Sequence, residues 1–136
     1  MEVTSGRGAR AERPLSPHLQ IYSPLINMVM SIVHRITGAA LYFGSILLAC
    51  WLVAAASGPD YYNYFVSWFG TWPGKVVLLG YTWVLLHHMM GGIRHFIWDT
   101  GHGYQIRTID LLSWGSLAVS LTLTAIIWAF ATLGGT

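Results

Sequence analysis

The chain has 136 residues, of which 54% are hydrophobic and only 9% are charged, with a formal net charge of +2. Soluble domains carry about 25% charged residues, so this composition excludes an ordinary soluble domain and indicates a membrane protein. The small positive charge comes from a basic flank and gives no reason to expect a nucleic-acid partner.

Three stretches are long and apolar enough to cross a bilayer as helices, which takes about 20 residues each. They cover roughly residues 26–56, 74–98 and 109–133. Burial in a soluble core would be the alternative, but a chain of this length leaves almost nothing to cover three such helices. The sequence therefore predicts an all-α membrane protein with an N-terminal segment over residues 1–25 and a three-helix transmembrane domain over residues 26–136.

The positions of the basic residues predict the orientation of the chain, because positively charged flanks are retained in the cytoplasm. Only Lys75 belongs to the opposite side, next to an aromatic-rich connection from Ser57 to Gly74 that is typical of an amphipathic surface segment. The other six basic residues lie on one side of the predicted spans: Arg7, Arg10, Arg13, Arg35, Arg94 and Arg107. We therefore expect that side, which includes the N-terminus, to be cytoplasmic.

The second span carries an unusual set of polar residues. His88, Gly92, His95 and Asp99 fall within about a 40° sector of one another at 3.6 residues per turn. Gly91 widens the bare patch beside Gly92. Such a patch allows close approach to the backbone by either a neighbouring helix or a flat ligand.

His88 lies one turn before these glycines, well inside the apolar layer, where a neutral imidazole offers a lone pair suited to haem iron. An interhelical hydrogen bond is the plainer interpretation of a histidine in a membrane span. His87 points about 100° away and is the rival ligand. Met89 and Met90 are ligands in principle, although flexible packing is their commoner role.

A haem on His88 would extend its propionates toward the inner interface. His88 and His95 differ by about 10 Å in height, so they cannot share one iron. Four residues are predicted to neutralise the propionates: His95, Arg94, Arg35 and His34. The third span has no His, Met, Lys or Cys, so a second axial ligand must come from another subunit or from a second copy of this chain.

The first span opens with Ser31, His34, Arg35 and Gly38, which share one helix face. Arg35 alone could simply reach the lipid head groups. Together, the Ser31 hydroxyl and the Arg35 cation could bind the carbonyl of a hydrophobic molecule and stabilise the negative charge that forms on its reduction. A quinone fits that description.

Three motifs in order at this spacing resemble the cytochrome b anchor subunits of succinate dehydrogenase, often called the b-556 family. They are the run from Arg13 to Tyr22, the run from Ser31 to Gly38, and the spaced set of His88, Gly92, His95 and Asp99. The resemblance covers residues 13 to about 133. It implies an anchor for a flavoprotein and an iron–sulfur subunit, paired with a second small hydrophobic subunit in the bacterial inner membrane; the mitochondrial inner membrane is an alternative.

Carried over position by position, the resemblance implies that His88 is an axial ligand of a haem b shared with the second anchor. It implies that Ser31 and Arg35 contact ubiquinone, and that His34, Arg35 and His95 lie near the haem propionates. Succinate oxidation in the tricarboxylic acid cycle would belong to the flavoprotein, because no residue here resembles a flavin site or a dicarboxylate pocket.

Three alternatives remain open at this point. The chain could be an autonomous homodimeric cytochrome b, or a fumarate reductase anchor that runs the reaction in reverse. It could also be a structural anchor or small transporter without a cofactor, in which the histidines only join helices.

Overall fold

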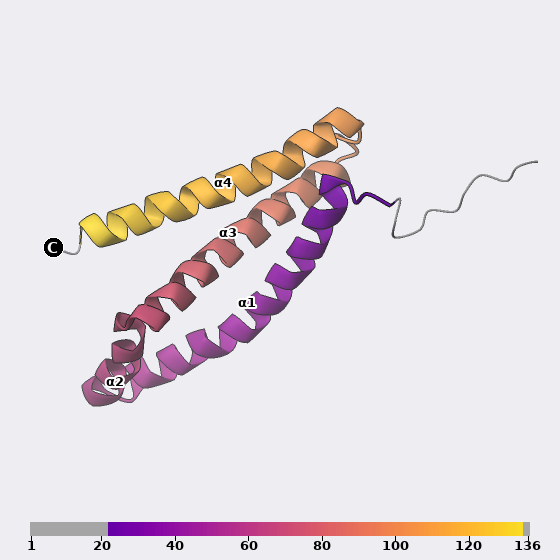
Figure 1. Cartoon of the computed structure of the whole chain (residues 1–136). Helices are drawn as coiled ribbons and strands as arrows, with labels where there is room; N and C mark the ends of the chain where they lie inside the picture. Colours follow the sequence, from indigo (N-terminus) through magenta and orange to yellow (C-terminus); the bar gives the residue numbers. More distant parts are fainter. Residues whose placement is uncertain (1–21, 135–136) are drawn as a thin grey trace, which may run out of the picture.

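Three long helices dominate the chain in a computed structural model that describes residues 22–134 (Figure 1). They are α1 (Ile26–Ala56), α3 (Trp72–Asp99) and α4 (Ile106–Leu133), and the short helix α2 (Pro59–Gly70) joins α1 to α3. All three long helices have the length and apolar composition of membrane spans. The prediction of an all-α protein with three spans is confirmed. The second span, α3, begins two residues earlier than predicted, and the third span, α4, begins three residues earlier.

Part of the predicted N-terminal segment lies outside the described residues. This applies to residues 1–21, which include Arg7, Arg10, Arg13 and most of the run from Arg13 to Tyr22. Residues 22–25 precede α1 without regular secondary structure.

The connection between the first two spans, predicted as an amphipathic surface segment, folds into the helix α2. Gly58 adopts a positive φ of 111°, which glycine tolerates, and Pro59 then occupies the first turn of the helix. Most of its large aromatic side chains remain exposed, including Tyr61, Tyr64 and Trp68. An amphipathic helix of this kind suits the boundary between lipid and water.

The helices alternate in direction, so the polar ends of several elements meet. The start of α1, the end of α3 and the start of α4 lie together at one end of the molecule, and α2 lies at the other (Figure 1). Among the described basic residues, Arg35, Arg94 and Arg107 belong to the first end and Lys75 to the α2 end. The fold thus keeps the charge asymmetry on which the predicted orientation depends.

Glycines bring α1 and α3 close together along an antiparallel interface. A Cβ on Gly44 would collide with the Tyr81 ring, and a Cβ on Gly91 would collide with the His34 ring. Each glycine therefore receives an aromatic ring from the opposite helix. Small residues allow this approach in membrane helices, where lipid provides no hydrophobic drive for association.

The α3–α4 interface is built from small hydroxyl residues. Four of them form a buried stripe on α4: Ser113, Ser116, Ser120 and Thr124. The hydroxyls of Ser116, Ser120 and Thr124 donate to carbonyls one turn earlier on their own helix, which satisfies them without water. The Ser113 hydroxyl oxygen accepts a hydrogen bond from Arg94 on α3. Within residues 22–134, Met30 is the only buried hydrophobic residue, while most bulky apolar side chains face outward, as expected for contact with lipid or another membrane subunit.

Candidate functional site

His88 projects from α3 onto the first half of α1, where its ring is half-buried. Its Nδ1 lies 3.2 Å from the backbone carbonyl oxygen of His34 and 3.2 Å from Oγ1 of Thr37. A carbonyl can only accept a hydrogen bond, so this contact assigns the proton to Nδ1. The Nε2 atom of neutral His88 then carries the lone pair, which is the form of imidazole that binds iron.

Three histidine rings gather at this point. The His34 and His88 rings stack with centroids 4.0 Å apart and an interplanar angle of 6°. The His95 ring lies 5.4 Å from that of His34, tilted by 48°, and its side chain is exposed. The structure therefore brings together the three histidines that the sequence singled out as ligand and propionate partners.

The glycines around His88 separate into two kinds. A Cβ on Gly38 would lie 3.0 Å from Cε1 of His88, and Gly91 is covered by the His34 ring, so both serve packing between α1 and α3. A Cβ on Gly92 would meet nothing within 4 Å. Of the bare patch predicted on α3, Gly92 remains open for a flat ligand or another subunit.

Ser31 and Arg35 lie one turn apart on α1 with both side chains exposed. Neither makes a side-chain hydrogen bond or ion pair within the described part of the chain. The face predicted for Ser31, His34, Arg35 and Gly38 thus divides, because His34 and Gly38 contact α3 while the other two point outward. Within residues 22–134, a hydroxyl and a cation are therefore exposed and unpaired beside the His34, His88 and His95 rings.

His87 points away from this cluster into the α3–α4 interface. It is only 2% exposed, its Nδ1 lies 3.1 Å from Oγ of Ser120, and its ring stacks on Trp83. Ser120 donates its own proton to the Leu117 carbonyl, so it accepts from His87. His87 is an interhelical hydrogen-bonding residue in this fold, which weakens it as the rival haem ligand.

Arg94 also faces α4. Its predicted role in neutralising the propionates stays a prediction. The side chain is 4% exposed, Nη1 donates to Oγ of Ser113 at 3.4 Å, and the guanidinium lies over the Trp98 ring at 5.2 Å. Arg94 is seven residues after His87 and therefore shares its stripe, which packs on α4. Among the described residues, no acidic side chain pairs with it.

Thr37 is the residue near His88 that sequence reasoning missed. It is 2% exposed and contacts both the His34 carbonyl and His88. Its place three residues after His34 on the same helix was the available signal, since threonine there bonds back to its own helix.

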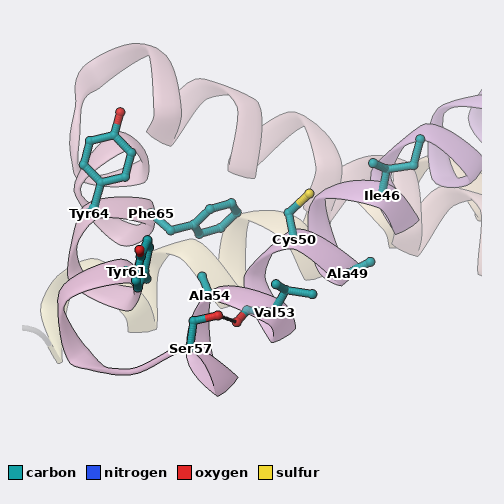
Figure 2. Close-up of a pocket in the computed structure, with 9 residues that line it drawn as sticks. All are labelled: Ile46, Ala49, Cys50, Val53, Ala54, Ser57, Tyr61, Tyr64 and Phe65. Atoms are coloured by element: carbon teal, nitrogen blue, oxygen red, sulfur yellow. Dashed lines mark hydrogen bonds between the residues drawn. The ribbon is translucent and has the colours of Figure 1, made fainter.

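An apolar hollow lies away from the histidines, where α2 folds back on the second half of α1 (Figure 2). It has a volume of about 490 Å³, and its lining includes Cys50, Phe65 and Tyr61. Ser57 closes one edge and donates to the Val53 carbonyl. The hollow offers little polar chemistry, so its lining does not compete with the histidine cluster as a redox site.

The fold and the site together define a helical membrane protein with three apolar helices of spanning length and a cluster of His34, His88 and His95 between two of them. The model of the succinate dehydrogenase/fumarate reductase transmembrane subunit family matches residues 9–127, so the chain belongs to that family.

Its relatives are cytochrome b subunits of succinate dehydrogenase. The chain is 36% identical over 117 residues to the succinate dehydrogenase cytochrome b556 subunit of Rickettsia typhi, covering 86% of this chain and 91% of the relative. It is 38% identical to the Paracoccus denitrificans cytochrome b556 subunit, with 86% and 90% covered. The human mitochondrial cytochrome b560 subunit is 35% identical over 108 residues, with 78% and 64% covered. Within its family, the chain is therefore a succinate dehydrogenase cytochrome b membrane subunit.

Proposed function

We propose that this chain anchors a succinate:quinone oxidoreductase in the membrane, binds haem b through His88 together with a second anchor subunit, and forms part of the site of ubiquinone reduction. The observation that carries the proposal is the His88 ring, whose Nδ1 is held by the His34 carbonyl and whose Nε2 is left to donate. Metal-binding histidines in proteins commonly have this arrangement, with the second ring nitrogen tied to a carbonyl or carboxylate.

The residues around His88 fit a haem. The open backbone at Gly92 would admit the edge of a flat macrocycle on the stripe that carries His88. The other axial ligand is expected from the second anchor, since α4 contains no His, Met, Lys or Cys. When bound, haem b would supply a one-electron carrier close to the quinone site.

The cationic and imidazole groups beside His88 support the placement of the propionates. His95 and Arg35 are exposed, and His34 lies between His95 and His88. These side chains can neutralise two carboxylates at the membrane boundary, where an unpaired charge is costly. The placement does not depend on Arg94, whose side chain contacts α4.

Quinone reduction is assigned to Ser31 and Arg35. The Ser31 hydroxyl would donate a hydrogen bond to one quinone oxygen, and the Arg35 guanidinium would fix that oxygen and stabilise negative charge that develops on it. The quinone takes up two electrons and two protons. The electrons would come from succinate, oxidised in the flavoprotein, by way of the iron–sulfur subunit. The exposure of both side chains in the described part of the chain supports this assignment.

The complex is proposed to lie in the bacterial cytoplasmic membrane with the N-terminus of this chain inside. Relatives from Rickettsia and Paracoccus support the bacterial location, and the clustering of Arg35, Arg94 and Arg107 at one end supports the orientation. A fumarate reductase anchor is the second candidate, since the matching family includes both enzymes.

The test is the composition and visible spectrum of the native complex, purified in mild detergent through a tag on this chain. We expect four subunits, a low-spin b-type spectrum, and succinate-dependent ubiquinone reduction. This chain alone with a complete haem spectrum would favour the autonomous cytochrome. A complex that contains no haem would contradict the assignment of His88.

A further inference from the structure

Thr37 places a hydroxyl at the buried contact between α1 and α3. Its side chain is 2% exposed. Oγ1 lies 2.9 Å from the His34 carbonyl oxygen and 3.2 Å from Nδ1 of His88. The same Nδ1 lies 3.2 Å from the same carbonyl, so hydroxyl, carbonyl and imidazole form a closed triangle of polar atoms.

The protons in this triangle can be assigned. The His34 carbonyl has no proton to give, so it accepts from both of its neighbours. Thr37 donates its hydroxyl proton to that carbonyl and leaves its oxygen lone pairs for Nδ1–H of His88. The imidazole proton is therefore shared between two acceptors on α1, and the ring is held in the form whose Nε2 is a free donor.

We infer that Thr37 is a positioning residue for His88: its hydroxyl, together with the His34 carbonyl, orients the imidazole and fixes its proton on Nδ1. The inference rests on the proposed function of His88 as a haem ligand. It adds a residue that touches neither iron nor quinone and acts only through the ligand. An acceptor on Nδ1–H makes an imidazole more electron-donating, which stabilises oxidised iron.

An ordinary helix back-bond does not account for the whole arrangement. Ser45 on the same helix donates to the Tyr42 carbonyl in the same way, but its side chain is exposed and contacts no residue of α3 through a hydrogen bond. Thr37 adds a contact across 51 positions of sequence to a ring that is also stacked on His34. Ser45 therefore serves as the matched control.

The experiment compares Thr37→Val, Thr37→Ser and Ser45→Ala in the intact complex. The measurements are haem content, the midpoint potential from redox titration, and the low-spin electron paramagnetic resonance signal. Valine keeps the shape of threonine without its hydroxyl, so Thr37→Val is expected to shift the potential upward and to change the resonance signal. Thr37→Ser and Ser45→Ala are expected to match the native complex.

Three results would overturn the inference. The first is a native potential and resonance signal in Thr37→Val, the second is an equal shift in Thr37→Val and Thr37→Ser, and the third is loss of haem from both variants. Loss of haem from Thr37→Val alone supports the inference when Thr37→Ser retains haem at the native potential. A His88→Leu complex that keeps its haem would instead refute the proposed function, whatever Thr37 does.

Discussion

His34 and His88 are 54 positions apart in the chain, yet their rings stack almost parallel with centroids 4.0 Å apart. The stack exists because Gly91 on α3 leaves room for the His34 ring, while Gly38 on α1 leaves room for His88. Each helix thus contributes one ring and one glycine to the same contact. This reciprocal packing holds the proposed iron ligand in place from the α1 side.

Replacing Gly91 with alanine should therefore destabilise the protein. Glycine to alanine inside a helix normally stabilises by about 0.5–1 kcal/mol. At Gly91 the new Cβ would collide with the His34 ring, and overpacking of this kind costs about 1–3 kcal/mol. Thermal unfolding of the purified complex should show a lower midpoint.

Gly80→Ala on the same helix is the control, because a Cβ there meets nothing within 4 Å. Its midpoint should equal or exceed that of the native complex. Similar midpoints for Gly80→Ala and Gly91→Ala would show that the His34 ring does not rest on Gly91.

The His87–Ser120 hydrogen bond should contribute to stability and not to the haem site. Ser120→Ala leaves the Nδ1 proton of His87 without its acceptor in a buried interface, which costs about 1–3 kcal/mol. The absorption spectrum of the complex should remain native. The coupling between the two residues is measured by a double-mutant cycle with His87→Leu, and additive effects on unfolding would argue against the bond.

Arg35→Leu should uncouple quinone reduction from succinate oxidation. Loss of one electrostatic donor in a preorganised site lowers rates by roughly 10²–10³-fold, so ubiquinone reductase activity should fall strongly. Reduction of an artificial dye by the peripheral subunits should persist. Arg107→Leu, at the same end of the molecule on α4, should affect neither activity. An equal loss of dye and quinone activity in Arg35→Leu would indicate failed assembly rather than a quinone-binding role.

Composition and periodicity were sufficient to predict the three spans and to place His88, Gly92 and His95 on one of them. They could not predict which stripe meets which helix, because each span is apolar around most of its circumference and gives no strong inward face. For this reason His87 stayed a rival to His88, the predicted ligand. Their separation into a structural residue facing α4 and a candidate ligand facing α1 depends on tertiary packing.

The same limit applies to Arg94. Its place near the C-terminal end of α3 follows from the sequence, but position along a helix does not fix the direction in which a side chain points. The signal that was overlooked lay on α4, where small hydroxyl residues recur at helical spacing: Ser113, Ser116, Ser120 and Thr124. Small polar residues on one face of a span indicate a close helix partner, and that partner encloses both Arg94 and His87.

The most direct test is the absorption spectrum of the assembled complex carrying His88→Leu, compared with His87→Leu. If the imidazole of residue 88 binds the iron, the leucine variant should lose or markedly shift its Soret band, while the neighbouring variant keeps a native band at lower thermal stability. A native Soret band in His88→Leu, or its loss only in His87→Leu, would contradict the assignment of the ligand.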